Sequence, residues 1–265
     1  MSAKPSTNLS AAALNVAMNV AVEAGKFITQ QISKLDRIEV RERDGDSHRR
    51  NLVSDVDIQV EQMIIEGLEL AYAEFSIQAR ESGEVQRDSE YSWIINPLNG
   101  THNFLHGHPQ CAVGIGLLHE SMPVASVIYD PFRNELFSAR KGGGAQLDGR
   151  RIRVSQNSRL RDSLFCTAVP NNSKESTKQW LKSYAQLLPR AQDIHQNSAS
   201  LLDMAFVSAG RYDGYWNFDV SQWTAPIGSL IIQEAGGLTT HNNGIYVAGT
   251  PKLHEKLNFM IAGIK

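Results

Sequence analysis

Three strand-like segments follow one another between residues 111 and 142 with no helix between them, and this run most restricts the folds open to the chain. The segments read CAVGIGLLHE, MPVASVIYD and NELFSARKG, and each is bounded by turn-forming or charged residues. Longer segments with apolar residues at helical spacing lie before and after the run. Irregular alternation of strands and helices predicts an α/β fold with layered sheets and helices, rather than a helix bundle or a β-sandwich.

Two long helices are expected ahead of the strand run. The first extends from Ala11 to about Lys34, with Ser10 as its N-cap, and the second extends from about Asp55 to Phe75. Both carry apolar residues on one stripe, which predicts that each packs against a sheet.

The second half of the chain changes character. It holds shorter strands and helices, with one helix closed by Gly210 and another capped by Gly236 and Gly237. We expect an N-terminal half, residues 1–145, and a C-terminal half, residues 146–265, joined in a single compact unit.

Composition narrows the class of protein. A formal charge of −2 and a pI near 6.4 argue against dominant non-specific nucleic-acid binding and leave a local RNA or protein contact open. Cys111 and Cys166 lie in apolar runs, which favours buried reduced thiols over a disulfide. The N-terminal run lacks a basic start, and charged and amide residues interrupt it. These features predict a cytoplasmic protein with no membrane contact.

Polar side chains follow an apolar strand in the stretch WIINPLNGTHNFLHGHP, residues 93–109. Asn96 and Asn99 lie where the strand ends, in the arrangement of a loop that delivers side chains to a site. If both were Asp, the loop would predict a magnesium site, because hard cations prefer anionic oxygen ligands.

Three motifs carry a resemblance to a known family: RESGE at 80–84, NPLNGT at 96–101 and QWTAPIGSLIIQEAGG at 222–237. In order, spacing and flanking residues they resemble the inositol monophosphatase family of magnesium-dependent phosphomonoesterases, and within it the bacterial SuhB-type proteins. The resemblance covers nearly the whole chain. It implies the five-layer αβαβα sandwich of the inositol monophosphatase and fructose-1,6-bisphosphatase-like superfamily, and a homodimer.

Four carboxylates hold the metal ions in that family, and this sequence replaces all of them. The residues at those positions are Arg80, Asn96, Asn99 and Thr224. Gly100 and Thr101 match the family positions that bind phosphate and place the attacking water. Asn217 replaces a substrate-contacting Glu, and Asn51 stands where many members have Asp.

Charge decides the expected chemistry. Each Asn lacks the negative charge that an Asp would place opposite a divalent cation, and Arg80 adds a permanent positive charge. An arginine can hold an anion, but it does not lower the pKa of a bound water as a metal does. We therefore expect no magnesium cofactor and no intact catalytic set, with Thr101 and Glu81 as vestiges of one. The remaining pocket could bind phosphate or sulfate through eight residues: Arg80, Asn96, Asn99, Gly100, Thr101, His102, Asn217 and Thr224.

The leading hypothesis is a catalytically inactive protein retained for a binding or regulatory role. By resemblance to SuhB-type proteins, that role is transcription antitermination and ribosomal RNA maturation with RNA polymerase, Nus factors and RNA. Two alternatives remain open. One is a magnesium-independent binder of a phosphorylated small molecule. The other is a residual inositol-1-phosphate phosphatase with a different metal arrangement, for example through Glu81 or Asp219.

Several other candidates have structural interpretations that we prefer. His102, His106 and His108 suggest a transition-metal site, but exposed histidines in a loop or at a helix start are favoured. Glu81 is expected to form hydrogen bonds behind the site. Structural roles are expected for Asp130 and Asp203, and a core or dimer-interface position is expected for the aromatic residues Tyr212, Tyr215 and Trp216. A binding role is open for Arg49 or Arg50 in the charged loop that contains them.

Overall fold

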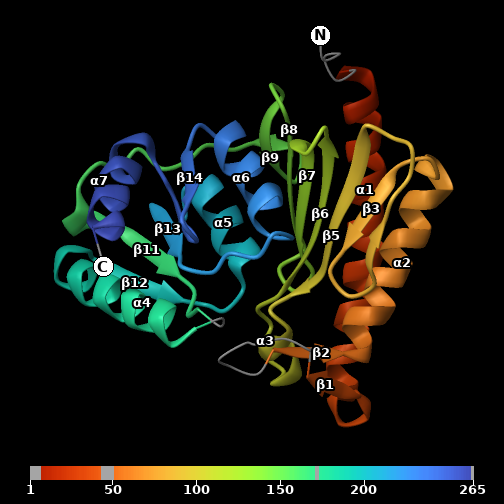
Figure 1. Ribbon diagram of the computed structural model, residues 1–265, viewed down its shortest axis with the longest axis horizontal. Coiled ribbons are helices and arrows are strands. Elements are labelled where there is room, and N and C mark those ends of the chain that lie inside the picture. The colour runs from red at the N-terminus through yellow and green to blue at the C-terminus, as the bar shows by residue number, and fades with distance from the viewer. Residues whose placement is uncertain (1–6, 43–50, 171–172, 264–265) are drawn as a thin grey trace.

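An eight-stranded sheet and a five-stranded sheet lie on either side of a central pair of helices (Figure 1). The computed structural model describes residues 7–42, 51–170 and 173–263. Two helices cover the outer face of the large sheet and two others cover the outer face of the small sheet. The order of layers is helix, sheet, helix, sheet, helix, as predicted.

The large sheet has the strand order β10-β9-β8-β7-β6-β5-β3-β4. Its long members pair antiparallel, apart from the parallel pair β3 and β5. The strands are β3 (Ser76–Ala79), β4 (Gly83–Val85), β5 (Tyr91–Asn99), β6 (Ala112–His119), β7 (Met122–Asp130), β8 (Glu135–Arg140), β9 (Gly144–Leu147) and β10 (Arg150–Arg151). Residues of β6 are buried along its whole length because helices cover both faces of the sheet.

The small sheet has the order β12-β11-β13-β15-β14. Its strands are β11 (Leu164–Thr167), β12 (Asp193–Gln196), β13 (Gly214–Asn217), β14 (Leu238–Asn242) and β15 (Ile245–Gly249). A separate two-stranded sheet joins β1 (Val40–Glu42) to β2 (Leu52–Ser54).

Helices form three of the five layers. The outer pair on the large sheet is α1 (Thr7–Gln31) and α2 (Asp55–Tyr72), the central pair is α5 (Ser200–Ser208) and α6 (Ala225–Glu234), and the outer pair on the small sheet is α4 (Lys174–Leu187) and α7 (Pro251–Ala262). Short helices are α3 (Thr101–Leu105) and the 3-10 turns η1 (Ile32–Arg37), η2 (Leu160–Asp162) and η3 (Leu188–Arg190). Three apolar clusters fill the spaces between the layers. One lies between the outer helices and the large sheet, one surrounds the central helices and contacts both sheets, and one lies between the small sheet and its outer helices.

Two predicted helix boundaries were wrong. The helix α1 begins at Thr7, so Ser10 is a buried residue inside it and not its N-cap. The earlier start is explained by Leu9, which packs against the apolar cluster between the outer helices and the large sheet. The second helix ends at Tyr72, since Phe75 packs in the core just ahead of β3. Its start at Asp55 was predicted correctly, and Ser54 caps it by accepting the amide of Asp57.

Two glycine caps were predicted correctly. Gly236 has φ of 89° beyond the end of α6, and the amide of Gly237 donates to the Ile232 carbonyl at 2.9 Å. Gly210 has φ of 71° and follows α5.

The segment Asn8–Arg37 is long and apolar enough, by composition alone, to cross a membrane. In the structure α1 packs on the large sheet, and one face of it is buried as in the core helix of a globular protein. The fully or almost fully buried residues are Ala13, Ala17, Ala21, Ala24 and Ile28.

The division at residue 145 stays a prediction. The large sheet continues to Arg151, and the central apolar cluster contains residues from both halves, such as Ile128 and Ile231. Cys111 and Cys166 are buried and unpaired, as predicted, and burial raises the pKa of both thiols.

Candidate functional site

The predicted strand-to-helix loop lies at the end of β5. Asn96 faces Gly114 on β6, and Asn99 faces Ala112, so two residues of β5 oppose a single residue of β6. This bulge includes Pro97, which has no amide hydrogen to donate to the neighbouring strand. Gly100 then adopts φ of 108° and α3 begins at Thr101.

Three of the four positions assigned to metal ligands by resemblance form one hydrogen-bonded chain. Arg80 Nη1 donates to Asn96 Oδ1 at 3.2 Å, and Asn96 Nδ2 donates to Thr224 Oγ1 at 3.1 Å. Thr224 Oγ1 lies 2.8 Å from Ser221 Oγ. We call Arg80, Asn96 and Thr224 the polar triad.

Chemistry fixes the direction of these bonds. A guanidinium only donates, so the oxygen of Asn96 turns to Arg80 and its amide nitrogen turns to Thr224. Asn96 is fully buried and Thr224 is 2% exposed, so a mismatched donor or acceptor here would be costly. The three residue types therefore satisfy one another.

Strand pairing brings the triad together. Ala79 on β3 lies beside Ile95 on the parallel strand β5, so the next residues, Arg80 and Asn96, meet at the same sheet edge. Thr224 is the residue just before α6, so its hydroxyl reaches Asn96 from the central helical layer.

Asn99 makes a different contact from the triad. Its Oδ1 accepts the amide of Leu201 at 2.9 Å, in the first turn of α5. Ala199, the residue at the N-cap of α5, has no side chain that could do this, so Asn99 supplies a cap from 102 residues away.

Thr101 contacts a carboxylate that the sequence interpretation missed. Thr101 Oγ1 donates to Asp57 Oδ1 at 2.9 Å, with Leu98 O at 3.2 Å as a second acceptor. Asp57 Oδ2 accepts from the amide of Ser54 at 2.8 Å. Burial raises the pKa of Asp57, against the opposing effect of hydrogen bonds from Ser54 and Thr101. The pattern Ser54-x-x-Asp57 signalled a helix cap but gave no sign of Thr101.

Glu61 is a second residue that sequence reasoning missed. Its two carboxylate oxygens accept the amides of Glu81 and Ser82, both at 2.7 Å, and thereby hold the loop that carries Arg80. Arg80 Nε lies 3.9 Å from Glu81 Oε1, and the two side chains are 19% and 7% exposed. A structural role for Glu81 stays a prediction.

Gly100 allows a prediction about the loop. A Cβ at Gly100 would lie 2.7 Å from the Gln110 carbonyl oxygen, at a φ that alanine tolerates poorly. We expect Gly100→Ala to lower the free energy of unfolding by about 2–3 kcal/mol in urea titrations. Gly83→Ala is the matched control, since Gly83 has φ of 89° with no atom within 4 Å, and about 1 kcal/mol is expected there. Equal losses would contradict a role for close packing at Gly100.

The remaining predicted site residues do not join the triad. Asn217 makes local bonds, donating to Tyr215 OH at 3.0 Å and accepting the amide of Asp219 at 2.9 Å. Asn51 directly precedes β2. The histidines of the HxxxHxH motif are all exposed, as expected: His102, His106 and His108.

Most of the other predicted structural residues are buried. Asp130 accepts the amides of Phe132 and Arg133 at 3.0 Å each, and Arg133 Nη1 at 2.7 Å. Asp203 is fully buried on α5. The three aromatic residues lie in the core: Tyr212, Tyr215 and Trp216. Arg49 and Arg50 lie outside the described residues.

The residues present do not fit a magnesium ion. The triad offers a guanidinium, an amide and a hydroxyl where the ion needs anionic oxygens. A unit positive charge about 4 Å from a divalent ion is repelled by about 8 kcal/mol at an effective dielectric of 20. Within residues 7–42, 51–170 and 173–263, no group of three or more His, Cys, Asp or Glu side chains could hold a metal.

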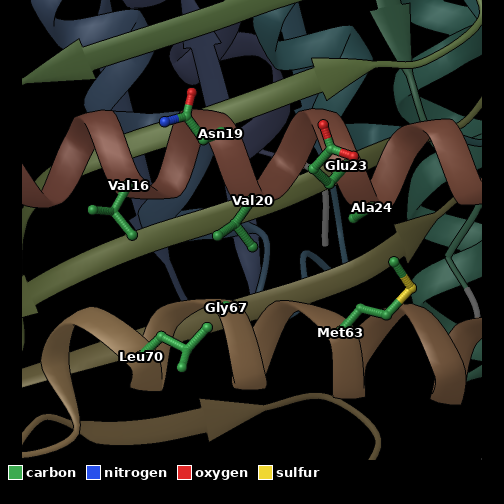
Figure 2. Close-up of a pocket in the computed structure, with 8 residues that line it drawn as sticks. All are labelled: Val16, Asn19, Val20, Glu23, Ala24, Met63, Gly67 and Leu70. Carbon is green, nitrogen blue, oxygen red and sulfur yellow. The ribbon is translucent and has the colours of Figure 1, made fainter.

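A groove of about 350 Å³ lies elsewhere, between the two outer helices (Figure 2). Val16 and Val20 of α1 face Met63 and Leu70 of α2 across it. None of the predicted site residues lines this groove.

Comparison with known proteins agrees with this architecture. Residues 11–262 match the inositol monophosphatase family. Nus factor SuhB of Pseudomonas aeruginosa is 37% identical over 257 residues, which cover 92% of this chain and 93% of that protein. Nus factor SuhB of Escherichia coli K12 is 33% identical over 249 residues, covering 91% of this chain and 92% of that protein.

A solved structure is also similar along almost its whole length. The extragenic suppressor protein SuhB of Bartonella henselae has a TM-score of 0.90 at 32% identity, covering 95% of this chain and 99% of that one. The predicted fold class is thereby confirmed. On the match over residues 11–262 and the likeness to SuhB proteins, this chain belongs to the inositol monophosphatase family.

Proposed function

We propose that this chain is a catalytically inactive, SuhB-type family member that acts by binding. Its partners would be RNA polymerase, Nus factors and RNA, in transcription antitermination and ribosomal RNA maturation. We propose further that it works as a cytoplasmic homodimer. The polar triad carries the first half of this proposal, and the printed names of the relatives support the second half.

The triad supports loss of metal catalysis because its parts match each other. A single Asp→Asn change would leave two or three carboxylates pointing at one another. Here a permanent cation, an amide and a hydroxyl occupy the positions together, and hydrogen bonds join Arg80 to Asn96 and Asn96 to Thr224. Such a set is stable without an ion and disfavours one electrostatically.

Thr101 and Asp57 do not restore the chemistry by themselves. Their hydrogen bond could place a water molecule, but the pKa of free water lies far above neutral pH, and a bound metal ion is what lowers it in metal-dependent hydrolases. A positioned water without that activation is a poor nucleophile toward a phosphomonoester.

A two-part assay tests the proposal. Purified protein is incubated with inositol 1-phosphate and either magnesium or EDTA, and we expect equal, background release of phosphate. Magnesium-dependent hydrolysis that disappears in Thr101→Val would overturn the inactive assignment; an activity unchanged by this substitution comes from a contaminating enzyme.

The second part measures association. The protein is mixed with purified RNA polymerase and Nus factors of its own source, and the mixture is separated by size exclusion. We expect co-elution, and we expect Arg80→Gln to leave it unchanged because the triad is largely buried. Failure to associate with any of these proteins would remove the binding half of the proposal.

A further inference from the structure

A dense group of positive charges lies along the β9–β10 edge of the large sheet. Figure 1 shows the turn between β8 and β9 at the end of the sheet away from α3. The segment 140–153 reads RKGGGAQLDGRRIR and covers the end of β8, β9, β10 and the two turns between them. It holds five cations and one carboxylate, Asp148, for a net charge of +4 in a chain with a formal charge of −2. The cations are Arg140, Lys141, Arg150, Arg151 and Arg153. We call this segment the basic hairpin.

We propose that the basic hairpin binds the phosphodiester backbone of a nucleic-acid strand. It shares no residue with the polar triad, so the proposal does not depend on whether the metal chemistry is lost.

The cations of the hairpin make no ion pairs with any residue that the structure describes. Several other arginines do form ion pairs, among them Arg133 with Asp130 at 2.7 Å and Arg159 with Asp162 at 2.5 Å. Four of the five hairpin cations are exposed, the exception being the half-buried Arg140. Like charges held this close together repel, so an external anion would relieve the repulsion.

A carboxylate of the central helices, Glu234, binds backbone amides of the hairpin and none of its cations. Glu234, at the end of α6, accepts the amides of Gly142 and Gly144 at 2.7 Å each. These two bonds anchor the turn to α6 and fix its position before any ligand arrives, which reduces the entropy lost on binding.

Glycines make room for two guanidinium groups over the same turn. A Cβ at Gly144 would lie 2.9 Å from Nη2 of Arg151, and a Cβ at Gly143 would lie 3.3 Å from Nε and Nη2 of Arg140. The two arginines therefore lie against the turn backbone. At about 3.3 Å per residue, β9 spans about 13 Å, a length suited to a few consecutive phosphates.

The chemistry of the hairpin favours phosphate over a protein surface. Four of its cations are arginines, whose planar guanidinium binds phosphate oxygens in pairs. The segment has no aromatic residue and none of the strongly exposed large apolar side chains of the described chain, so it lacks the anchors typical of protein interfaces. Without aromatic stacking, it would contact the backbone and ignore the bases.

Fluorescence anisotropy with a labelled mixed-sequence single-stranded RNA tests the proposal. With three or four phosphates contacted, the logarithm of affinity should fall with the logarithm of salt at a slope of about −2 to −3, or roughly 20–60-fold between 50 and 200 mM. A charge-removing variant should bind at least about tenfold more weakly at low salt, with a slope near zero. Its four substitutions, all at exposed positions, are Lys141→Gln, Arg150→Gln, Arg151→Gln and Arg153→Gln.

A control variant removes the same charge from other exposed sites: Lys34→Gln, Arg37→Gln, Lys178→Gln and Lys252→Gln. We expect it to bind RNA within about twofold of the unmodified protein, and thermal unfolding should show both variants folded. If RNA affinity fell equally in both variants, net charge alone would explain the effect and the proposal would be overturned. Absence of RNA binding by the unmodified protein would also overturn it.

Further arms identify the ligand. DNA of the same sequence should bind within a few fold of RNA if the backbone is what is recognised, and a strong preference for RNA would identify RNA as the source of that backbone. An acidic peptide of equal charge that binds as tightly as RNA, with the same loss in the hairpin variant, would overturn the assignment to nucleic acid.

Discussion

Placing carboxylates at Arg80, Asn96, Asn99 and Thr224 is expected to create a magnesium response, and we expect none in the unmodified protein. The variant carries Arg80→Glu, Asn96→Asp, Asn99→Asp and Thr224→Asp. At a magnesium concentration 100 times the dissociation constant, the folded state should gain about 2.7 kcal/mol. For a domain of this size that raises the melting temperature by about 5–10 °C. The unmodified protein should show no shift.

The three triad changes are made together because the triad is internally matched, and Asn99→Asp supplies the fourth carboxylate. Asn96→Asp alone would place a carboxylate beside the Arg80 guanidinium and form an ion pair, which neutralises the new charge. Without magnesium, the fourfold variant should be less stable than the unmodified protein, since it adds four carboxylates in a largely buried region, three of them at the triad positions.

The control for this experiment keeps similar side-chain sizes without the charge. Arg80→Gln with Thr224→Asn leaves Asn96 and Asn99 in place and should not respond to magnesium. Isothermal titration at pH 8 measures the affinity directly. A magnesium response in the unmodified protein as large as in the fourfold variant would show that the metal site was never lost. No response in the fourfold variant would show that these positions are not a ligand set.

The second large effect concerns Asp203, a fully buried residue whose carboxyl has only one of its two oxygens in a hydrogen bond. Asp203 Oδ1 accepts Asn197 Nδ2 at 2.7 Å, and Oδ2 is buried with no hydrogen-bond partner. Burial raises the pKa of Asp203 to about 7 from its ordinary value of 3.8, against the lowering effect of the Asn197 hydrogen bond.

The sign of the pH effect follows from proton uptake. Between pH 4 and pH 7 the folded state holds the Asp203 proton and the unfolded state has lost it, so the free energy of unfolding falls as pH rises through this range. The whole shift corresponds to about 4 kcal/mol, most of it lost by pH 7. Above pH 7 both states are ionised and this contribution stays constant.

Asp203→Asn should remove this dependence. Urea titrations at pH 5 and pH 8 measure how far the free energy of unfolding falls between the two pH values. We expect this fall to be about 3 kcal/mol smaller in Asp203→Asn than in the unmodified protein. Asp130→Asn is the comparison, because Asp130 is equally buried but accepts three hydrogen bonds, and it should lose stability at both pH values. Parallel pH curves for the unmodified protein and Asp203→Asn would contradict the raised pKa.

Much of the fold could be predicted from local patterns. Strand and helix segments, the α2 start at Asp55 and the Gly236 cap all follow from residue types within a few positions of one another. Helix ends were less predictable: Leu9 extends α1 and Phe75 shortens α2 because each packs against residues far along the chain.

The sequence identified several residues of the site, but it did not predict which residues contact one another. Arg80, Asn96 and Thr224 were singled out by their motifs, but Asp57 and Glu61 were missed because their partners lie 44 residues and about 20 residues away. A capping pattern such as Ser54-x-x-Asp57 looks the same whether or not a threonine from another element reaches the carboxylate.

By itself, the sequence determined the charges available at the four replaced positions, and with them the expectation that magnesium is not held. Only the tertiary structure decided which of these residues are neighbours. The parallel pairing of β3 with β5 sets Arg80 beside Asn96, while the bulge after Asn96 turns Asn99 toward α5. The physical reason is that side-chain charge is a local property, whereas strand register and bulges are set by packing between distant segments.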